Sequence, residues 1–321
     1  MVEIIVMTEG GRIDLKVKKS HMKRIPLLAC VLYCIALHAQ PAFWSSPHAY
    51  LGQTPPGDTP VQFAAGMLVV KDSFDMDRVG FSDDGKEFYY ETNNTWYSTV
   101  PVVLRSFAYK GGQWVGPTVV LRGFWSPSFS ANQQTMYLSG RGIDDSTHAY
   151  VWQSKRLPAG GWETPTVFLR QPHALYNYMT TNSGNGYVGS NVSKGHFDAC
   201  VMHFSAGDTS IQSLGAPLNA PGWNGDFFIA RDESYIIISA KETKDFECEL
   251  YISFRKPEGG WTAPVSLGPL INDGLAHRWG EYVTPDGRYL FYTRATSPKD
   301  CHLYWVRFDK LLARMRAVVV R

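Results

Sequence analysis

The sequence has no excess of charge of either sign that would direct it toward a highly charged partner. Its 31 Lys and Arg side chains face 29 Asp and Glu side chains. Residues 1–39 account for the positive excess, because residues 40–321 hold 25 basic and 26 acidic side chains. Nucleic acids and anionic membrane surfaces bind concentrated positive charge. We therefore expect no nucleic-acid partner.

The sequence also lacks an apolar run long enough to cross a bilayer. Residues 25–37 (IPLLACVLYCIAL) form a run of 13, whereas a spanning helix needs about 20 residues. A basic stretch precedes this run, and Ala39 offers a cleavage point, which is typical of a signal peptide. Because Met22 begins a complete signal, residues 1–21 are interpreted as an upstream extension. We expect a cleaved, exported chain without a membrane span, in the periplasm or secreted.

Cysteine is scarce and gives no disulfide framework. Two of the five cysteines lie in the predicted signal peptide. Cys200, Cys248 and Cys301 remain, an odd number in similar strand-like contexts. The simplest interpretation is small strand residues, and one disulfide stays open as an alternative.

Motifs for common catalytic and cofactor chemistry are missing as well. The histidines are scattered without the spacing of a helical zinc site. There is no Gly-rich phosphate loop and no Gly-x-Ser-x-Gly elbow. The sequence therefore predicts no cofactor and no metal.

A repeat of short β segments is present instead. Five similar stretches open their turns at anchors spaced 48, 51, 49 and 54 residues apart. A period near 50 built from strands is the signature of a β-propeller. The anchors are Ser82, Ser130, Thr181, Ala230 and Thr284.

Each repeat predicts four strands. The anchor turn is clearest in residues 83–86 (DDGK) and 285–288 (PDGR), where Asp and Gly suit a tight turn. A buried aromatic strand and a third strand follow. Three repeats then carry a Gly-Gly turn with a Trp, at Trp114, Trp162 and Trp261, which predicts an outer, edge-like strand.

These patterns predict an all-β fold with about five four-stranded blades, and six is the alternative. The last repeat lacks its outer strand, and residues 59–70 (TPVQFAAGMLVV) resemble the missing piece. Pairing the two ends would close the ring and remove an open edge. The expected organisation is an extension and signal peptide over 1–39, a lead-in over 40–58, the propeller over 59–309 and a short helix or tail over 310–321.

Residues 248–272 (CELYISFRKPEGGWTAPVSLGPLIN) and 281–292 (EYVTPDGRYLFY) resemble the WD40-like Pro-Asp-Gly β-propeller repeat of TolB-type exported proteins. The resemblance covers about residues 50–310. The Pro-Asp-Gly triplet itself is intact at residues 285–287 only. The resemblance implies a binding or interaction scaffold and implies no catalytic residues.

Propellers bind ligands along the central channel, so residues before each inner strand are the candidate site. Reading back from the anchors gives a ring that mixes aromatic and carboxylate side chains. The ring comprises Asp77, Arg78, Trp125, Ser126, Tyr176, Asn177, Gly225, Asp226, Trp279, Gly280 and Glu281. The alternative is that these residues plug the channel and hydrogen-bond one another.

Two functions follow from this ring. The first is an exported, non-catalytic scaffold that binds an envelope or extracellular protein, a peptide or a glycan. Its candidate ligand-binding residues are Arg78, Trp125, Tyr176, Asn177, Asp226, Arg278, Trp279 and Glu281. The second is a secreted glycan-active hydrolase with Asp77, Asp226 and Glu281 as catalytic carboxylates, because glycoside hydrolysis needs paired acids about 5–10 Å apart. The sequence favours the scaffold.

Overall fold

The computed structural model describes residues 4–9, 12–17, 42–70, 73–95, 100–140, 149–193, 197–205, 208–219, 226–240, 243 and 247–319. The chain divides into two compact units, Met1–Ala42 and Phe43–Arg321. In the first unit, β1 (Ile4–Glu9) pairs with β2 (Arg12–Val17) as an antiparallel hairpin. The predicted signal segment, residues 25–37, and the cleavage point lie outside the described residues.

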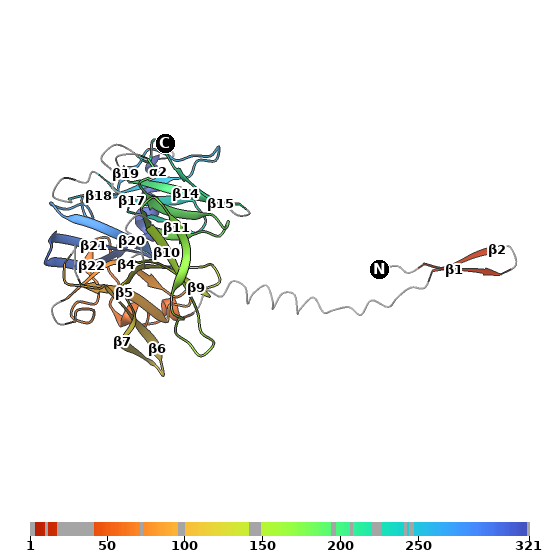
Figure 1. Cartoon of the computed structure of the whole chain (residues 1–321), viewed down its shortest axis with the longest axis horizontal. Coiled ribbons are helices and arrows are strands. Elements are labelled where there is room, and N and C mark those ends of the chain that lie inside the picture. Colours follow the sequence, from red (N-terminus) through yellow and green to blue (C-terminus); the bar gives the residue numbers. More distant parts are fainter. Residues whose placement is uncertain are drawn as a thin grey trace. The chain divides into compact units, whose positions relative to one another are not determined.

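The second unit is the predicted all-β propeller. Within its described residues, five antiparallel four-stranded sheets are arranged around a common axis (Figure 1). The inner strands are β4 (Phe74–Phe81), β8 (Phe124–Phe129), β12 (Leu175–Thr180), β16 (Phe227–Ile229) and β20 (His277–Val283). The second strands are β5 (Glu87–Asn93), β9 (Thr135–Gly140), β13 (Gly186–Ser190), β17 (Tyr235–Ala240) and β21 (Tyr289–Ser297).

The third and outer strands complete each blade. The third strands are β6 (Val103–Lys110), β10 (Ala149–Lys155), β14 (Asp198–Ser205), β18 (Glu249–Phe254) and β22 (Asp300–Arg307). The outer strands are β7 (Gln113–Arg122), β11 (Thr166–Gln171), β15 (Asp208–Ser213), β19 (Val265–Ser266) and β3 (Val61–Gln62).

The predicted ring closure is confirmed. Strand β3 pairs with β22 from the other end of the chain, in the order β20-β21-β22-β3. The next residue, Phe63, donates its N–H to the Leu303 carbonyl at 2.8 Å. Its fully buried ring lies within 4.9–5.3 Å, centroid to centroid, of Phe88, Phe291 and Trp305. Aromatic packing of this kind adds to the burial of apolar area, so both chain ends stabilise the fifth blade.

The anchor turns share one hydrogen-bond pattern, which explains why the repeat can be recognised in the sequence. The Ser82 hydroxyl bonds the Asp84 carboxylate at 2.6 Å and accepts the Glu87 N–H at 2.9 Å. Thr284 repeats both bonds with Asp286 and Tyr289. Ser130 with Asn132 and Thr181 with Ser183 are variants of the first bond. Only the fourth blade lacks the hydroxyl, because its anchor is Ala230.

The lead-in packs across the turns of the first and fifth blades. The Trp44 indole N–H donates to the Asp83 carbonyl at 2.9 Å, and its ring covers Gly85, whose φ is 74°. A Cβ at Gly85 would lie 2.9 Å from that indole. The Tyr50 hydroxyl donates to the Asp286 carboxylate. The lead-in includes the 3-10 helices η1 (Ala42–Ser45) and η2 (Tyr50–Gly52).

Trp162, the tryptophan of the Gly-Gly turn of the second blade, joins that blade to the first. Trp162 donates its indole N–H to the Tyr89 hydroxyl of the first blade at 3.0 Å. The Arg156 guanidinium stacks on this indole at 4.4 Å and pairs with Glu87 at 2.8 Å. The predicted covering tryptophan is therefore also an inter-blade contact.

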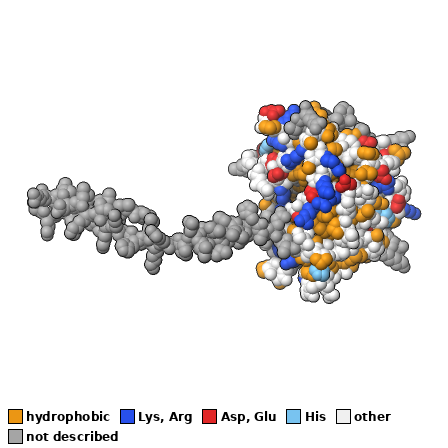
Figure 2. All heavy atoms as spheres, turned by 180° about the vertical axis from the view of Figure 1, so that it is seen from behind, with side chains coloured by type: hydrophobic (Ala, Val, Ile, Leu, Met, Phe, Trp, Pro, Cys, Tyr) orange, Lys and Arg blue, Asp and Glu red, His pale blue; other side chains and the backbone are white. Residues whose placement is uncertain are grey.

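The chain ends in α2 (Asp309–Val319), whose Leu311 is buried against the fourth and fifth blades. Among the described residues, no helix is long and apolar enough to cross a membrane. Seen from behind the view of Figure 1, Lys and Arg side chains gather near the middle of the propeller face (Figure 2).

Candidate functional site

The inner strands bulge where they face the propeller axis. Pairing with the second strand is interrupted between Met76 and Gly80 in β4, and at the corresponding places in β8, β12 and β20. The bulged residues adopt positive φ. They are Asp77 (66°), Ser126 (51°), Asn177 (54°) and Gly280 (68°). Bulges re-aim side chains and often lie beside functional sites, and here they set four of the predicted ring positions.

The bulge of the fifth blade depends on glycine. A Cβ at Gly280 would lie 2.5 Å from the carbonyl carbon of Asp77 and 2.7 Å from its oxygen. The backbone of β20 thus lies directly against that of β4. This close approach brings Glu281 beside Asp77 and Arg78.

Arg78 lies at the centre of an acidic cluster. Its side chain is 1% exposed and interacts electrostatically with Asp226, Glu281, Asp77 and Glu91. The guanidinium donates to the Phe227 carbonyl of the fourth blade. Burial lowers the pKa of Arg78, and the surrounding carboxylates oppose that shift. We call these five residues the axial cluster.

Burial raises the pKa of each acid in the axial cluster. For Glu281 the pKa is raised to about 7, against a hydrogen bond from Ser239 and the charge of Arg78. For Asp226 burial is reinforced by Glu281 and Asp77, and the pKa lies well above its ordinary value. Burial also raises the pKa of Asp77 and, with the charge of Asp77, that of Glu91. Four acids around one guanidinium therefore hold protons more tightly than free carboxyls do.

Hydrogen bonds hold the cluster in place. Ser239 donates to Glu281 Oε1 at 2.5 Å. The Asn177 amide donates to Asp226, and the Ser126 backbone N–H donates to Glu91. Within the described residues, Arg78 Nε, Arg78 Nη1 and Glu281 Oε2 are buried without a hydrogen-bond partner. Glu281 is 0% exposed, whereas Asp77 and Asp226 are half-buried.

The structure brings some of the predicted residues together and directs others elsewhere. Asp77, Arg78, Asn177, Asp226 and Glu281 meet in or beside the axial cluster.

The predicted aromatic residues lie outside the cluster. Trp125 is half-buried, and Tyr176, beside Phe197 with ring centroids 5.1 Å apart, is 41% exposed. Trp279 is buried and stacks on His277 with 4.1 Å between centroids, and burial lowers the pKa of His277 to about 4.

The Arg278 side chain is held by hydrogen bonds to backbone carbonyls. Its Nε donates to the Ile271 carbonyl at 2.9 Å and its Nη1 to the Cys248 carbonyl at 3.0 Å. Its Nη2 donates to the Asp273 carbonyl. The guanidinium thus ties the link before β20 to the start of the third strand of the fourth blade.

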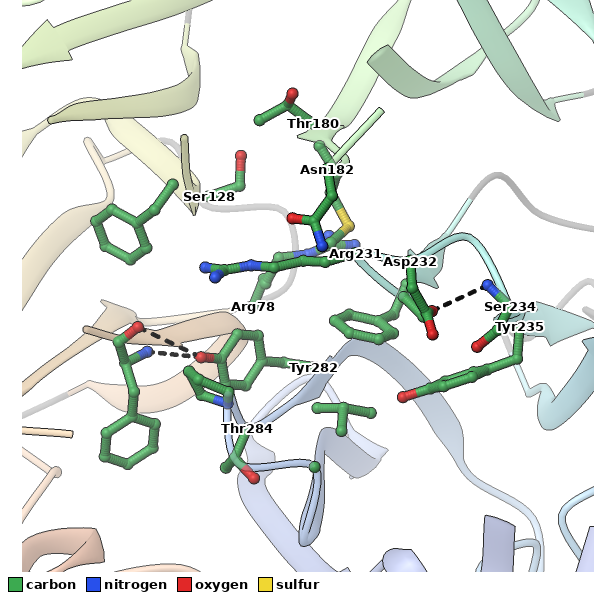
Figure 3. Close-up of a pocket in the computed structure, with 18 of the residues that line it drawn as sticks. Arg78, Ser128, Thr180, Asn182, Arg231, Asp232, Ser234, Tyr235, Tyr282 and Thr284 are labelled. Atoms are coloured by element: carbon green, nitrogen blue, oxygen red, sulfur yellow. Dashed lines mark hydrogen bonds between the residues drawn. The ribbon is translucent and has the colours of Figure 1, made fainter. Parts of the chain in front are cut away.

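An open cavity that the sequence did not indicate lies at the anchor-turn end of the inner strands. Its volume is about 420 Å³, with Arg78 among its lining residues, and the inner strands of all five blades contribute to it. Figure 3 shows Asn182, Arg231, Asp232 and Tyr282 converging on this space from different blades. The lining also includes Leu312 and Arg316 of α2. The position of Asn182 and Arg231 just after the anchors is the one signal that could have found it.

Arg231 links two turns at this end of the channel. Its Nη1 lies 2.8 Å from Asp83 Oδ1, so a residue of the fourth blade pairs with one of the first. The Asn182 N–H donates to the Arg231 carbonyl at 2.8 Å. These contacts connect turns of the third, fourth and first blades.

Metal binding has no support in the described part of the chain, where no group of three or more His, Cys, Asp or Glu side chains could hold an ion. In the axial cluster, the positive charge that faces the four acids comes from Arg78.

No protein-family model matches the chain. No curated protein matches it in sequence.

Solved structures with similar folds include TolB from Acinetobacter baumannii, 13% identical over 95% of this chain and 78% of that one, with a TM-score of 0.44. The periplasmic gluconolactonase PpgL of Pseudomonas aeruginosa is 12% identical over 71% of this chain and 66% of that one, with a TM-score of 0.40. A puromycin-hydrolyzing peptidase of Mycobacterium tuberculosis is 16% identical over 72% of this chain, with a TM-score of 0.43.

The chain spans only 36% of that peptidase's length. The predicted repeat family is not identified by these comparisons. Structural similarity at this level assigns neither an activity nor a ligand to this chain.

Proposed function

We propose that this chain is an exported, non-catalytic β-propeller that binds a protein, peptide or glycan partner at an end of its central channel. At the end where the inner strands begin, exposed Tyr176 and half-buried Trp125 and Asp226 would contact the partner. Asn177 would hold Asp226 in place through its amide. Arg278 and Trp279 would support the strand that carries Glu281.

The observation that carries this proposal is the closed axial cluster. Glu281 is 0% exposed and Arg78 is 1% exposed, and Arg78 interacts electrostatically with all four acids. A hydrolase needs an acid and a base or nucleophile that both reach the substrate. A cluster whose Glu281 and Arg78 are buried in this way suits a rigid support for binding surfaces.

A hydrolase using Asp77, Asp226 and Glu281 is the second candidate. The observation in its favour is the pKa of Glu281, raised to about 7 by burial, which would suit a general acid at neutral pH. It requires Glu281 to become accessible.

One pair of measurements separates the two functions. The purified chain is incubated with plant and bacterial polysaccharides, and new reducing ends are assayed. The same chain is immobilised to capture partners from an envelope extract, with Tyr176→Ala as the comparison. We expect no hydrolysis of the polysaccharides. We also expect the immobilised chain to capture a partner, and we expect Tyr176→Ala to weaken that capture. Turnover that is abolished by Asp226→Asn would establish the hydrolase instead.

The proposed export of the chain can be tested separately. We propose that the signal peptide is cleaved after Ala39, so N-terminal sequencing of the chain recovered outside the cytoplasm should begin at Gln40. A recovered chain that retains residues 22–39 would contradict cleavage.

A further inference from the structure

A second depression continues from the axial cavity across the anchor-turn face. It has a volume of about 780 Å³ and lies between the turns of the third and fourth blades and α2. The two spaces share Asn182, Arg231, Asp232, Ser234 and Arg316. We call them together the turn-face groove.

Positive side chains dominate the groove. Arg231, Arg255, Lys256 and Arg316 line it, against Asp232 and Glu233. Arg231 is paired with Asp83. For Arg255, Lys256 and Arg316, the described residues provide no carboxylate within 4.0 Å.

The two acids of the groove are already engaged. Glu233 accepts from Thr181 and Tyr187 at 2.7 and 2.8 Å, and also from Ser183 and Asn185. Burial opposes ionisation of Glu233, but these hydrogen bonds together hold its pKa below its ordinary value. Asp232 accepts the Ser234 N–H at 3.0 Å.

Aromatic rings position two of the cations. The Arg255 guanidinium lies 5.2 Å from the Trp261 ring centre, and that of Arg316 lies 5.6 Å from Phe254. Arg316 also donates to the Ser234 hydroxyl at 3.0 Å. Stacked guanidinium groups lose little freedom when they bind a carboxylate. The guanidinium groups of Arg255 and Arg316 are therefore positioned to bind anionic groups.

The inner end of the groove is apolar. Phe129, Met179, Phe228 and Leu312 line the cavity beside Arg78. A ligand that satisfies the whole groove therefore needs several negative charges and an adjoining apolar group. An extended acidic peptide has both, whereas an anionic polysaccharide has only the charges.

We propose that the turn-face groove binds an extended acidic peptide segment of a partner protein, with carboxylates at Arg255, Lys256 and Arg316 and an apolar side chain in the cavity. This inference rests on the proposed binding function, and it adds a contact surface at the anchor-turn end of the channel, away from Tyr176. The acidic segment complements the surplus positive charge of the groove.

A displayed library of random peptides, selected against the intact chain, tests this inference. We expect the selected peptides to combine several Asp or Glu residues with a Leu or Phe. Their affinity should fall with added salt, and by at least about tenfold in the double variant Lys256→Glu, Arg316→Glu. The matched control is Lys110→Glu, Lys299→Glu, which makes the same charge change at exposed positions outside the groove and should leave affinity unchanged.

The inference would be overturned by selection of no peptides, by selection of peptides without an excess of acidic residues, or by an equal loss of affinity in both double variants. Binding of oligogalacturonate without acidic peptides would assign the groove to anionic glycans instead. Selected peptides whose binding depends on Tyr176 and not on Lys256 would contradict the groove and leave the proposed binding function standing.

Discussion

Arg78 and Arg231 lie at two levels of the same channel, and their surroundings differ in kind. Arg78 is buried among four acids whose pKa values burial raises. Arg231 forms a partly exposed ion pair with Asp83 at the open, anchor-turn end. Low dielectric at the first level makes each charge costly and strengthens the attraction between opposite charges, whereas charges at the second level are screened by water. This difference supports the proposal that the buried axis keeps the propeller rigid and that the open end contacts a partner.

The largest expected effect comes from removing the guanidinium at each level. Arg78→Met leaves buried acids without their cation, and we expect about 3–5 kcal/mol loss in the free energy of unfolding near neutral pH. Arg231→Met removes an exposed ion pair and should cost about 1 kcal/mol or less. Urea unfolding of both variants measures the difference. Equal losses would remove the distinction between the two levels.

A second comparison uses glycine at the same two levels. Gly280→Ala would place a Cβ 2.5 Å from the Asp77 carbonyl carbon at a φ of 68°. Clash and backbone strain together should lower stability by about 3 kcal/mol. Gly287, in the anchor turn of the same blade, has a φ of 72°, and a Cβ there would have no atom within 4 Å, so Gly287→Ala should cost about 1 kcal/mol from strain alone. Thermal unfolding would contradict the close backbone approach if the two losses matched.

The smallest expected effect is a change in pH dependence. The pKa of Glu281 is raised to about 7 in the folded chain, so its contribution to stability is present below its unfolded pKa and is lost as pH rises toward 7. Glu281→Gln should therefore flatten this decline and be about 2 kcal/mol more stable than the parent near pH 8. Asp83→Asn, at the open end, should leave the slope unchanged. Urea unfolding between about pH 5 and 8 provides the comparison, and an unchanged slope in Glu281→Gln would contradict it.

The fold was predictable because each blade repeats the same local chemistry. The anchor hydroxyls and the Asp-Gly turns are set by bonds between residues two to five apart, as between Ser82, Asp84 and Glu87. Ring closure was predictable for a different reason, because residues 59–70 resemble the piece that the last repeat lacks. The five blades and the pairing of β3 with β22 followed from these two signals.

The site was only partly predictable. Counting back from the anchors found Asp77, Asp226 and Glu281, because each lies three to five residues before the anchor of its blade. The same count could not show that Arg78 lies among them, since its environment includes Asp226 of the fourth blade and Glu281 of the fifth. Arg278 lies beside Trp279 in the sequence, yet its guanidinium turns to the Cys248 and Ile271 carbonyls. The turn-face groove depends on how α2 and the turns of separate blades meet, which no local pattern encodes.

The most direct test of the closed axial cluster is a carboxyl-carbon NMR titration of the glutamates in the intact chain, assigned with Glu281→Gln. The account predicts one glutamate resonance that titrates near pH 7 and disappears in that variant. A Glu281 resonance that titrates at the ordinary value for a solvent-exposed glutamate, about 4.3, would show that the cluster is open and would contradict the account.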